Sequence, residues 1–321
     1  FMDPMKINNR PYRSIWVEPD ASPVIRIIDQ RYLPHQLVIE DLKSSDQVVQ
    51  AIKEMHLRGA PLIGVAAAYG VYLAVREAAG EASFHDYLSS AIKKLRQSRP
   101  TAVNLEWALQ TQLDAIASAR SVGEKMRTAL DQANRMADED VERCEKIGEH
   151  GLPLIEEISR RKNGDTVHIQ THCNAGWLAC VDWGTATAPV YKAFDRGIRV
   201  HVWVNETRPR NQGASLTAWE LSQHGLPHTV IADSAGGHLM QCGMIDLVLV
   251  GTDRVSLTGD VTNKIGTYLQ ALAAQDNQVP FYVAAPSTSI DWALEDAFGT
   301  VPIEERSPDE VTHISGWCDG E

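Results

Sequence analysis

The C-terminal half of the chain alternates between short apolar segments and segments with helical periodicity, and this alternation constrains the fold more than any other feature. Strands are predicted at 166–171, 198–204, 228–232, 246–250 and 280–284. Helices are predicted near 185–195, 213–224, 236–241 and 262–275. Strands that are separated by helices form a parallel sheet covered by helices on both faces. We therefore predict an α/β fold with a Rossmann-like parallel sheet in this half.

The N-terminal part follows a different pattern, in which short strands precede a series of helices. The segments SIWVE, PVIRIID and QLVIE within residues 12–40 predict strands joined by polar turns. Helices are predicted at 45–57 with Ser45 as cap, 62–79, 84–95, 102–119 and 123–149, with a break at 98–101. Gly148, Gly151 and Pro153 are expected to end or kink the long charged helix 123–149.

These patterns divide the 321 residues into three parts. We predict a smaller N-terminal β-plus-helical domain at 6–122, a connecting long helix at 123–150 and a Rossmann-like catalytic domain at 151–321. Two domains are the better expectation for a chain of this length. Residues 1–4 look like vector-derived sequence before a native start at Met5, so they do not enter the fold prediction.

Charge and cysteine content exclude several classes of protein. The formal net charge of −12 argues against a nucleic-acid partner, because such partners require a basic face. No apolar run approaches the ~18 residues of a membrane span, and no secretory signal opens the sequence. The five cysteines are odd in number and scattered, which is typical of a reducing compartment. We therefore expect a cytoplasmic protein with no membrane partner.

Polar clusters follow every predicted strand of the C-terminal half. They are Cys173-Asn174, residues 205–213, residues 233–238, residues 251–254 with 259–264, and residues 285–288. The carboxyl ends of parallel strands converge on one crevice, where open α/β sheets bind their ligands. We therefore expect these loops to line one pocket.

Each candidate residue also has an ordinary structural interpretation. A lone cysteine such as Cys173 is more often a small buried hydrophobe, although its place before a helix favours the thiolate form. Asp253 could cap a turn or pair with Arg254 at the surface. Asn263 and Lys264 lie at a predicted helix start, where they could be capping residues or part of a phosphate site.

Two N-terminal segments carry the same ambiguity. Residues 58–61 (RGAP) could simply end a helix, or their glycine could let the backbone approach a ligand closely. Arg99 before Pro100 is equally open to both interpretations. No glycine-rich nucleotide loop and no nucleophile elbow is present. No metal site is predicted, because neighbouring residues 172 and 173 on a strand would face opposite ways.

Seven motifs occur in order over nearly the whole chain. They are RGAPLIGVAAAYG (58–70), SRPTAVNLEWAL (98–109), THCNAGWLA (171–179), ETRPRNQGASLTAWEL (206–221), GTDRV (251–255), GDVTNKIGTY (259–268) and PIEERSP (302–308). With these motifs the chain resembles the methylthioribose-1-phosphate isomerase family. That family is related to archaeal ribose-1,5-bisphosphate isomerases and to regulatory subunits of the eukaryotic initiation-factor exchange complex.

The resemblance implies an aldose–ketose isomerase that converts 5-methylthioribose 1-phosphate to 5-methylthioribulose 1-phosphate in methionine salvage. It also implies a homodimer that uses neither a metal nor an organic cofactor. By matching motif positions, Cys173 corresponds to the family's catalytic cysteine and Asp253 to its proton-donating aspartate. The implied substrate contacts are Arg58, Gly59, Ala60, Arg99, Gln212, Asn263 and Lys264.

Departures from the family pattern leave alternatives open. The family usually continues some tens of residues beyond 314–316, so part of the pocket wall is expected outside this chain. The segments 203–213 and 232–240 resemble a subgroup with another 5-substituent, so 5-deoxyribose 1-phosphate and ribose 1,5-bisphosphate are alternative substrates. A noncatalytic, sugar-phosphate-sensing regulatory subunit is the alternative of another class. The Cys173 and Asp253 pair argues against it, because the regulatory subunits lack that pair.

Overall fold

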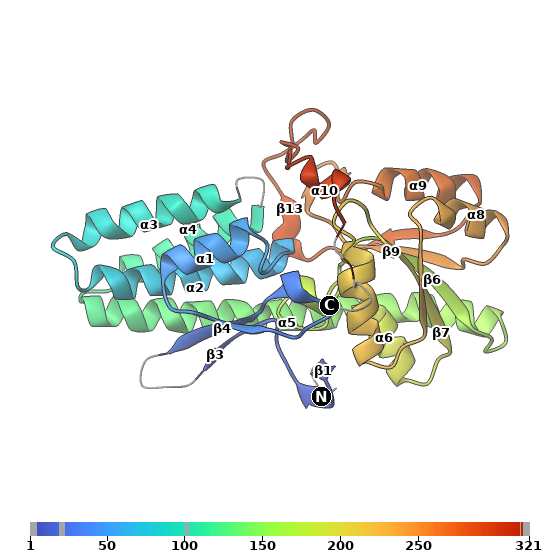
Figure 1. Cartoon of the computed structure of the whole chain (residues 1–321), viewed down its shortest axis with the longest axis horizontal. Helices are drawn as coiled ribbons and strands as arrows, with labels where there is room; N and C mark the ends of the chain where they lie inside the picture. Colours follow the sequence, from blue (N-terminus) through green and yellow to red (C-terminus); the bar gives the residue numbers. More distant parts are fainter. Residues whose placement is uncertain (1–4, 19–22, 100–102, 315, 317–321) are drawn as a thin grey trace.

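The computed structural model describes residues 5–18, 23–99, 103–314 and 316. The segment 1–4 and part of the break predicted at 98–101 lie outside these residues. Two domains lie side by side along the long axis of the molecule, and helix α5 (Val122–Arg161) runs along both of them (Figure 1). No helix of the described residues is long and apolar enough to cross a membrane.

The N-terminal domain packs four helices and α5 beside a three-stranded antiparallel sheet. The elements are β3 (Ile15–Glu18), β4 (Val24–Ile28), β5 (Ile39–Leu42), α1 (Ser45–Lys53), α2 (Ala60–Ala78), α3 (Phe84–Ser98) and α4 (Val103–Ala117). Helix α2 is the core of this domain, because nearly every one of its small or apolar residues is buried. The cap of α1 is Ser44, which forms a capping box with Gln47, so the prediction of Ser45 as cap was wrong.

Helix α5 is longer than predicted, because it continues through Pro153 to Arg161. The predicted end of this helix near residue 149 was therefore wrong. A Cβ atom on Gly151 would lie 2.4 Å from the ring of Pro189, which belongs to α6 (Ala188–Asp195). The same construction on Gly148 places the atom 2.8 Å from the Lys192 side chain. These glycines therefore serve close packing of two helices rather than helix termination.

The C-terminal domain is built on a five-stranded parallel sheet. Its strands are β6 (Val167–Thr171), β7 (Val200–Asn205), β8 (His228–Ile231), β9 (Leu247–Val250) and β12 (Phe281–Val283), in the order β12-β9-β6-β7-β8. Helices α6, α7 (Ala218–Gln223), α8 (Ala235–Gln241) and α9 (Thr267–Asp276) connect them. The predicted Rossmann-like sheet is confirmed. The chain reverses its direction of winding between β6 and β9, so this is the topological switch point.

The segment predicted as a helix at 262–275 begins differently. Residues Val261–Thr262 form β11, which pairs antiparallel with β10 (Arg254–Ser256), and β13 (Ile290–Asp291) pairs with the other edge of β10. The backbone of Gly266 then adopts a left-handed conformation (φ 101°), and α9 starts only at Thr267. Lys264 therefore lies in a loop before the helix, not at its first turn.

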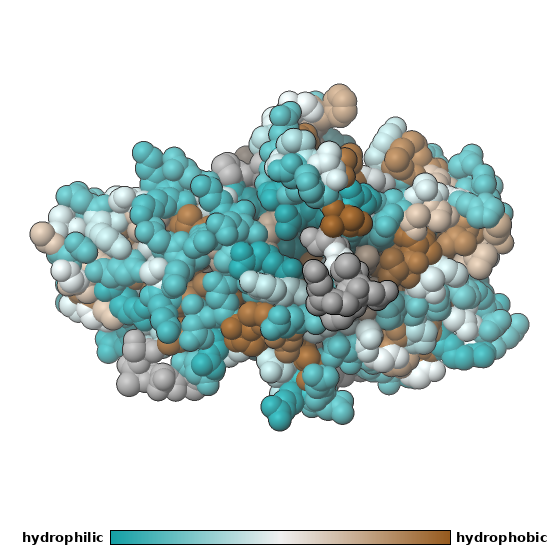
Figure 2. All heavy atoms as spheres, viewed as in Figure 1, coloured by the Kyte–Doolittle hydropathy of each residue, from teal (hydrophilic) through white to brown (hydrophobic). Residues whose placement is uncertain are grey.

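Short elements complete the chain. They are β1 (Lys6–Ile7), β2 (Arg10–Pro11), η1 (Gln30–Tyr32), η2 (Trp177–Ala179), the π-helical turn η3 (Gly213–Thr217), η4 (Ser287–Ser289) and α10 (Asp309–Thr312). Viewed from the same side, polar residues cover most of the N-terminal helices, and hydrophobic residues form patches near the middle of the molecule and on the C-terminal domain (Figure 2).

Candidate active site

A cavity of about 260 Å³ lies where the amino end of α2 meets the loops after β6 and β9. Its volume is close to the lower end of the range for small-molecule sites. The loops after β6 and β9 flank the switch point of the sheet, which is where ligands bind in open α/β folds. Its lining includes all nine residues predicted for the site: Arg58, Gly59, Ala60, Arg99, Cys173, Gln212, Asp253, Asn263 and Lys264.

Cys173 occupies a constrained position directly after β6. Its backbone has a φ of 64°, and its N–H donates to Oγ1 of Thr207 at 2.8 Å. The thiol donates to Oε1 of Gln212 at 3.2 Å. Burial raises the pKa of the Cys173 thiol, and the positive charges of Arg58 and Lys264 only partly oppose this. The helix entrance expected at Cys173 is wrong, because the helical segment closest in sequence, η2, starts only at Trp177.

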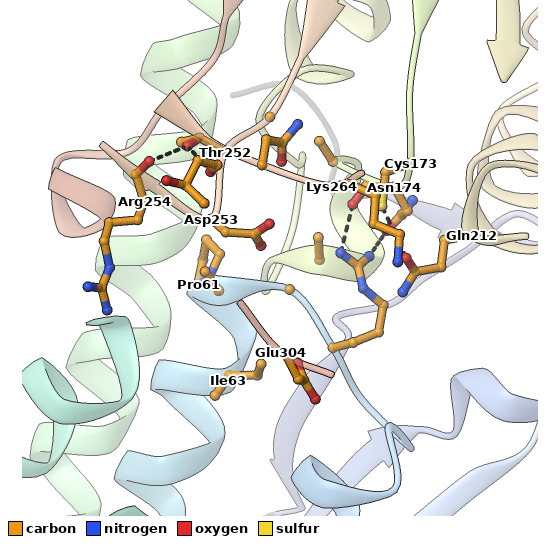
Figure 3. Close-up of a pocket in the computed structure, with 18 of the residues that line it drawn as sticks. Pro61, Ile63, Cys173, Asn174, Gln212, Thr252, Asp253, Arg254, Lys264 and Glu304 are labelled. Atoms are coloured by element: carbon orange, nitrogen blue, oxygen red, sulfur yellow. Dashed lines mark hydrogen bonds between the residues drawn. The ribbon is translucent and has the colours of Figure 1, made fainter. Parts of the chain in front are cut away.

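Asp253 faces the same cavity from the opposite side, beyond the carboxyl end of β9 (Figure 3). Its carboxyl group is accessible from the cavity, and it forms no hydrogen bond or ion pair with the described part of the chain. Desolvation by the surrounding cavity walls raises the pKa of Asp253, and the charge of Glu304 acts in the same direction. Arg58, Arg99 and Lys264 lower this pKa. A ligand that displaces water from the cavity would raise it further.

Arg58 and the amino end of α2 form one wall of the cavity. The Arg58 guanidinium is buried, and it donates to Oδ1 of Asn174 at 2.5 Å and to the Asn174 carbonyl at 2.9 Å. Gly59 has a φ of 101°, and a Cβ atom there would lie 2.4 Å from the carbonyl of Ala179. Only glycine therefore allows the N-terminal domain to approach the loop after β6 this closely.

The cationic residues of the cavity fall into two groups. Arg99 pairs with Glu304 at 3.2 Å, Arg306 pairs with the same carboxylate at 2.8 Å, and Arg254 lies 3.5 Å from Asp291. In the described part of the chain, Arg58 and Lys264 have no carboxylate within ion-pair distance. These two cations are therefore the ones whose charge is available to an anionic ligand.

The structure also identifies site residues that the sequence analysis did not single out. His172 lines the cavity, accepts from Nδ2 of Asn205 at 3.0 Å and donates from Nε2 to the carbonyl of Ile265 at 2.7 Å. Burial lowers the pKa of His172, so the neutral ring holds the loop that carries Lys264. Trp177 is buried in the core and does not line the cavity.

Among the residues that the structure describes, two groups of side chains have the composition of a metal site. They are Asp140 with Cys144 and Cys180, and Asp29 with Glu40 and His56. Both are engaged with the protein, since Asp140 accepts from the Val181 N–H and Asp29 pairs with Arg31. Of these six residues only Cys180 lines the cavity.

Comparison with known proteins places the chain. The Initiation factor 2 subunit family matches residues 56–318. A protein of Desulfatibacillum aliphaticivorans named methylthioribose-1-phosphate isomerase is 55% identical over 316 residues, which cover 98% of this chain and 86% of that protein. A protein of Methylocella silvestris with the same name is 56% identical over 319 residues, with coverages of 99% and 86%. The chain belongs to the methylthioribose-1-phosphate isomerase family.

Solved structures of this isomerase family and its relatives share the fold. A structure described as 5-methylthioribose 1-phosphate isomerase from Pyrococcus horikoshii is 38% identical with a TM-score of 0.82, and the match covers 95% of this chain and 83% of that one. A structure from A. fulgidus described as the delta subunit of translation initiation factor eIF-2B is 40% identical with a TM-score of 0.77, covering 94% and 85%. The predicted family and the prediction of an aldose–ketose isomerase are therefore confirmed.

Proposed function

We propose that this isomerase converts 5-methylthioribose 1-phosphate to 5-methylthioribulose 1-phosphate, with Cys173 and Asp253 as its catalytic residues. The observation that carries the proposal is their arrangement. A thiol and a carboxyl group reach one cavity from the two loops that flank the switch point of the sheet. The relatives' names support this choice of substrate, and the shared cavity supports these roles for Cys173 and Asp253.

Ring opening is the first chemical requirement. A phosphate on the anomeric oxygen blocks spontaneous opening, so an acid must protonate the ring oxygen while the bond from that oxygen to C1 breaks. The raised pKa of Asp253 favours the protonated acid, and the absence of a protein partner in the described residues leaves its proton available to a ligand. A ligand that excludes water would strengthen both properties.

Hydrogen must then move from C2 to C1 of the open chain. Cys173 is placed to act as base and then acid through an enediolate, or to assist a direct hydride shift. The first route requires the thiolate, and the raised pKa of Cys173 makes that form unfavourable in the empty site. The Gln212 contact orients the sulfur, because the thiol donates to its amide oxygen at 3.2 Å.

Fixed positive charge is required for the phosphate. Among the described residues, Arg58 and Lys264 have no carboxylate partner and no side chain caps the amino end of α2, which adds the positive end of a helix dipole. Arg99 is a further predicted contact, and a phosphate that reached it would displace Glu304. We assign the binding of the sugar phosphate to these groups together with Gly59, Ala60, Gln212 and Asn263.

The charge pairing of the cavity favours a monophosphate over ribose 1,5-bisphosphate. A second phosphate would need further unpaired cations, whereas Arg99, Arg254 and Arg306 each already face a carboxylate. The lining also includes apolar residues that suit a methylthio or deoxy group at C5: Met55, Ile63, Ala179, Val301 and Ile303.

The test is a coupled ketose assay on a small panel of ribose 1-phosphates that differ only at C5. We expect turnover to be fastest with the methylthio substituent, slower with the 5-deoxy sugar and lowest with the bisphosphate. Preference for the bisphosphate would refute the substrate. Binding of sugar phosphates without any turnover would instead support the regulatory alternative, in which the site senses its ligand.

Location and assembly remain part of the proposal. The four described cysteines are all free, which agrees with a reducing cytoplasm. The homodimer is carried by the resemblance to the family, and light scattering of the purified chain would test it.

A further inference from the structure

A buried carboxyl group that the proposed mechanism does not use lies directly behind the loop that follows Cys173. Glu220 is on the inner face of α7 and is only 1% exposed. Its Oε2 accepts the N–H of Leu178 at 3.2 Å, and its Oε1 has no hydrogen-bond partner in the described residues. A Cβ atom on Gly176 would lie 1.2 Å from this Oε1, so the carboxyl group is pressed against the loop backbone.

The loop that Glu220 contacts supports both the candidate nucleophile and a candidate phosphate ligand. Asn174 follows Cys173 and accepts both hydrogen bonds from Arg58. Its Nδ2 donates to Oγ1 of Thr217 at 3.1 Å, and Thr217 in turn donates to the Cys173 carbonyl at 2.7 Å. Thr217 and Glu220, one helical turn apart, therefore hold loop 173–178 from the side that faces away from the cavity.

The surroundings of Glu220 favour its uncharged form. Burial raises the pKa of Glu220 to about 8, while the Leu178 N–H, the Asn174 and Tyr191 side chains and the charge of Arg58 act to lower it. An ionised Glu220 would place a negative charge behind Arg58 and reduce the charge that Arg58 offers to the cavity.

We propose that Glu220 is a positioning residue of the isomerase: its carboxyl group holds loop 174–178 so that Arg58 and Cys173 face the ligand. This inference rests on the proposed function, because it assigns Glu220 a role in the same site. Glu220 does not line the cavity, so it acts through the backbone of the loop that it contacts.

The experiment compares Glu220→Gln, Glu220→Ala and the control Ser222→Ala, an exposed position on the same helix. We expect Glu220→Gln and the control to keep kcat/KM within about twofold of wild type at neutral pH. Glu220→Ala should lose about tenfold to a hundredfold, because it leaves buried polar groups of the loop unsatisfied. The ratio of kcat/KM for Glu220→Gln to that of wild type should rise as the pH passes about 8. A purely structural carboxyl would produce no such rise.

A second measurement separates this inference from the proposed function. The rate at which iodoacetamide alkylates Cys173 is followed by peptide mass spectrometry, with and without inorganic phosphate. Faster alkylation and weaker phosphate protection in Glu220→Ala support the positioning role even if no sugar is turned over. Unchanged alkylation and protection in Glu220→Ala would overturn it, as would a pH-independent activity ratio for Glu220→Gln. If Glu220→Ala does not fold, the pH dependence of Glu220→Gln decides.

Discussion

Replacing Asp253 with asparagine tests the assigned acid most directly. Asparagine has nearly the same shape as a protonated aspartic acid and the same charge, but it cannot donate the proton that ring opening needs. The Asp253 carboxyl makes no hydrogen bond or ion pair within the described residues, so the substitution breaks no protein contact. The expected cost in stability is therefore no more than about 0.5 kcal/mol.

The expected cost in rate is far larger. General acid catalysis contributes roughly 10²–10⁴ in rate, which corresponds to about 3–5 kcal/mol of transition-state stabilisation. We expect kcat to fall by that factor while KM stays unchanged, because binding does not require the proton. In wild type, kcat/KM should also fall as the pH rises through the raised pKa of Asp253, and the variant should lack this dependence.

The assay is ketose formation by purified wild type, Asp253→Asn and the control Asp276→Asn, an exposed residue at the end of α9. Thermal unfolding of each protein confirms that the fold is intact. Turnover by a folded Asp253→Asn variant within about tenfold of wild type would remove Asp253 from the role of acid, because a general acid is worth at least ~100-fold.

Three further predictions follow from the same contacts. Cys173→Ala should lose at least about 10²-fold in kcat and keep its affinity for inorganic phosphate, measured by calorimetry; near-normal turnover would contradict its role. Asn174→Asp should pair a carboxylate with Arg58 and raise KM for the sugar phosphate by about tenfold or more, since hydrogen bonds to charged groups are worth ~1.5–3 kcal/mol. An unchanged KM would show that Arg58 does not bind phosphate. The pKa of Glu220 is raised from 4.5 to about 8, so the stabilising contribution of this group is complete below pH 4.5 and is lost as the pH rises towards 8. The melting temperature of Glu220→Gln should therefore rise relative to that of wild type between these two pH values. A constant difference in melting temperature would exclude the raised pKa.

Much of the arrangement could be predicted from the sequence because it follows from local patterns. Alternating strands and helices fix a parallel sheet, and a parallel sheet brings the loops after its strands to one edge. The strand pattern alone therefore predicts that the Cys173 and Asp253 loops line one pocket. The remaining lining residues were found through long motifs, since nothing in the spacing of Arg58 and Arg99 brings them to the C-terminal sheet.

Contacts between residues that are distant in sequence could not be predicted, because no local pattern encodes them. Arg99 and Glu304 are 205 positions apart, and no local pattern shows that one neutralises the other. Glu220 did leave a signal, because a charged residue occupies a position on the apolar face of its helix beside Leu221. The wrongly predicted end of α5 has a different cause. Gly148 and Gly151 allow close packing against α6 and do not end the helix.

The unbroken helix α5 restricts where residues can be inserted or deleted in related sequences. Forty residues at 1.5 Å each give a rod of about 60 Å that belongs to both domains. Inserting or deleting a single residue at its middle would turn one half against the other by about 100° and point Asp140 away from the backbone of Val181. Insertions and deletions should therefore be confined to the two ends of the rod or occur in steps that restore whole turns.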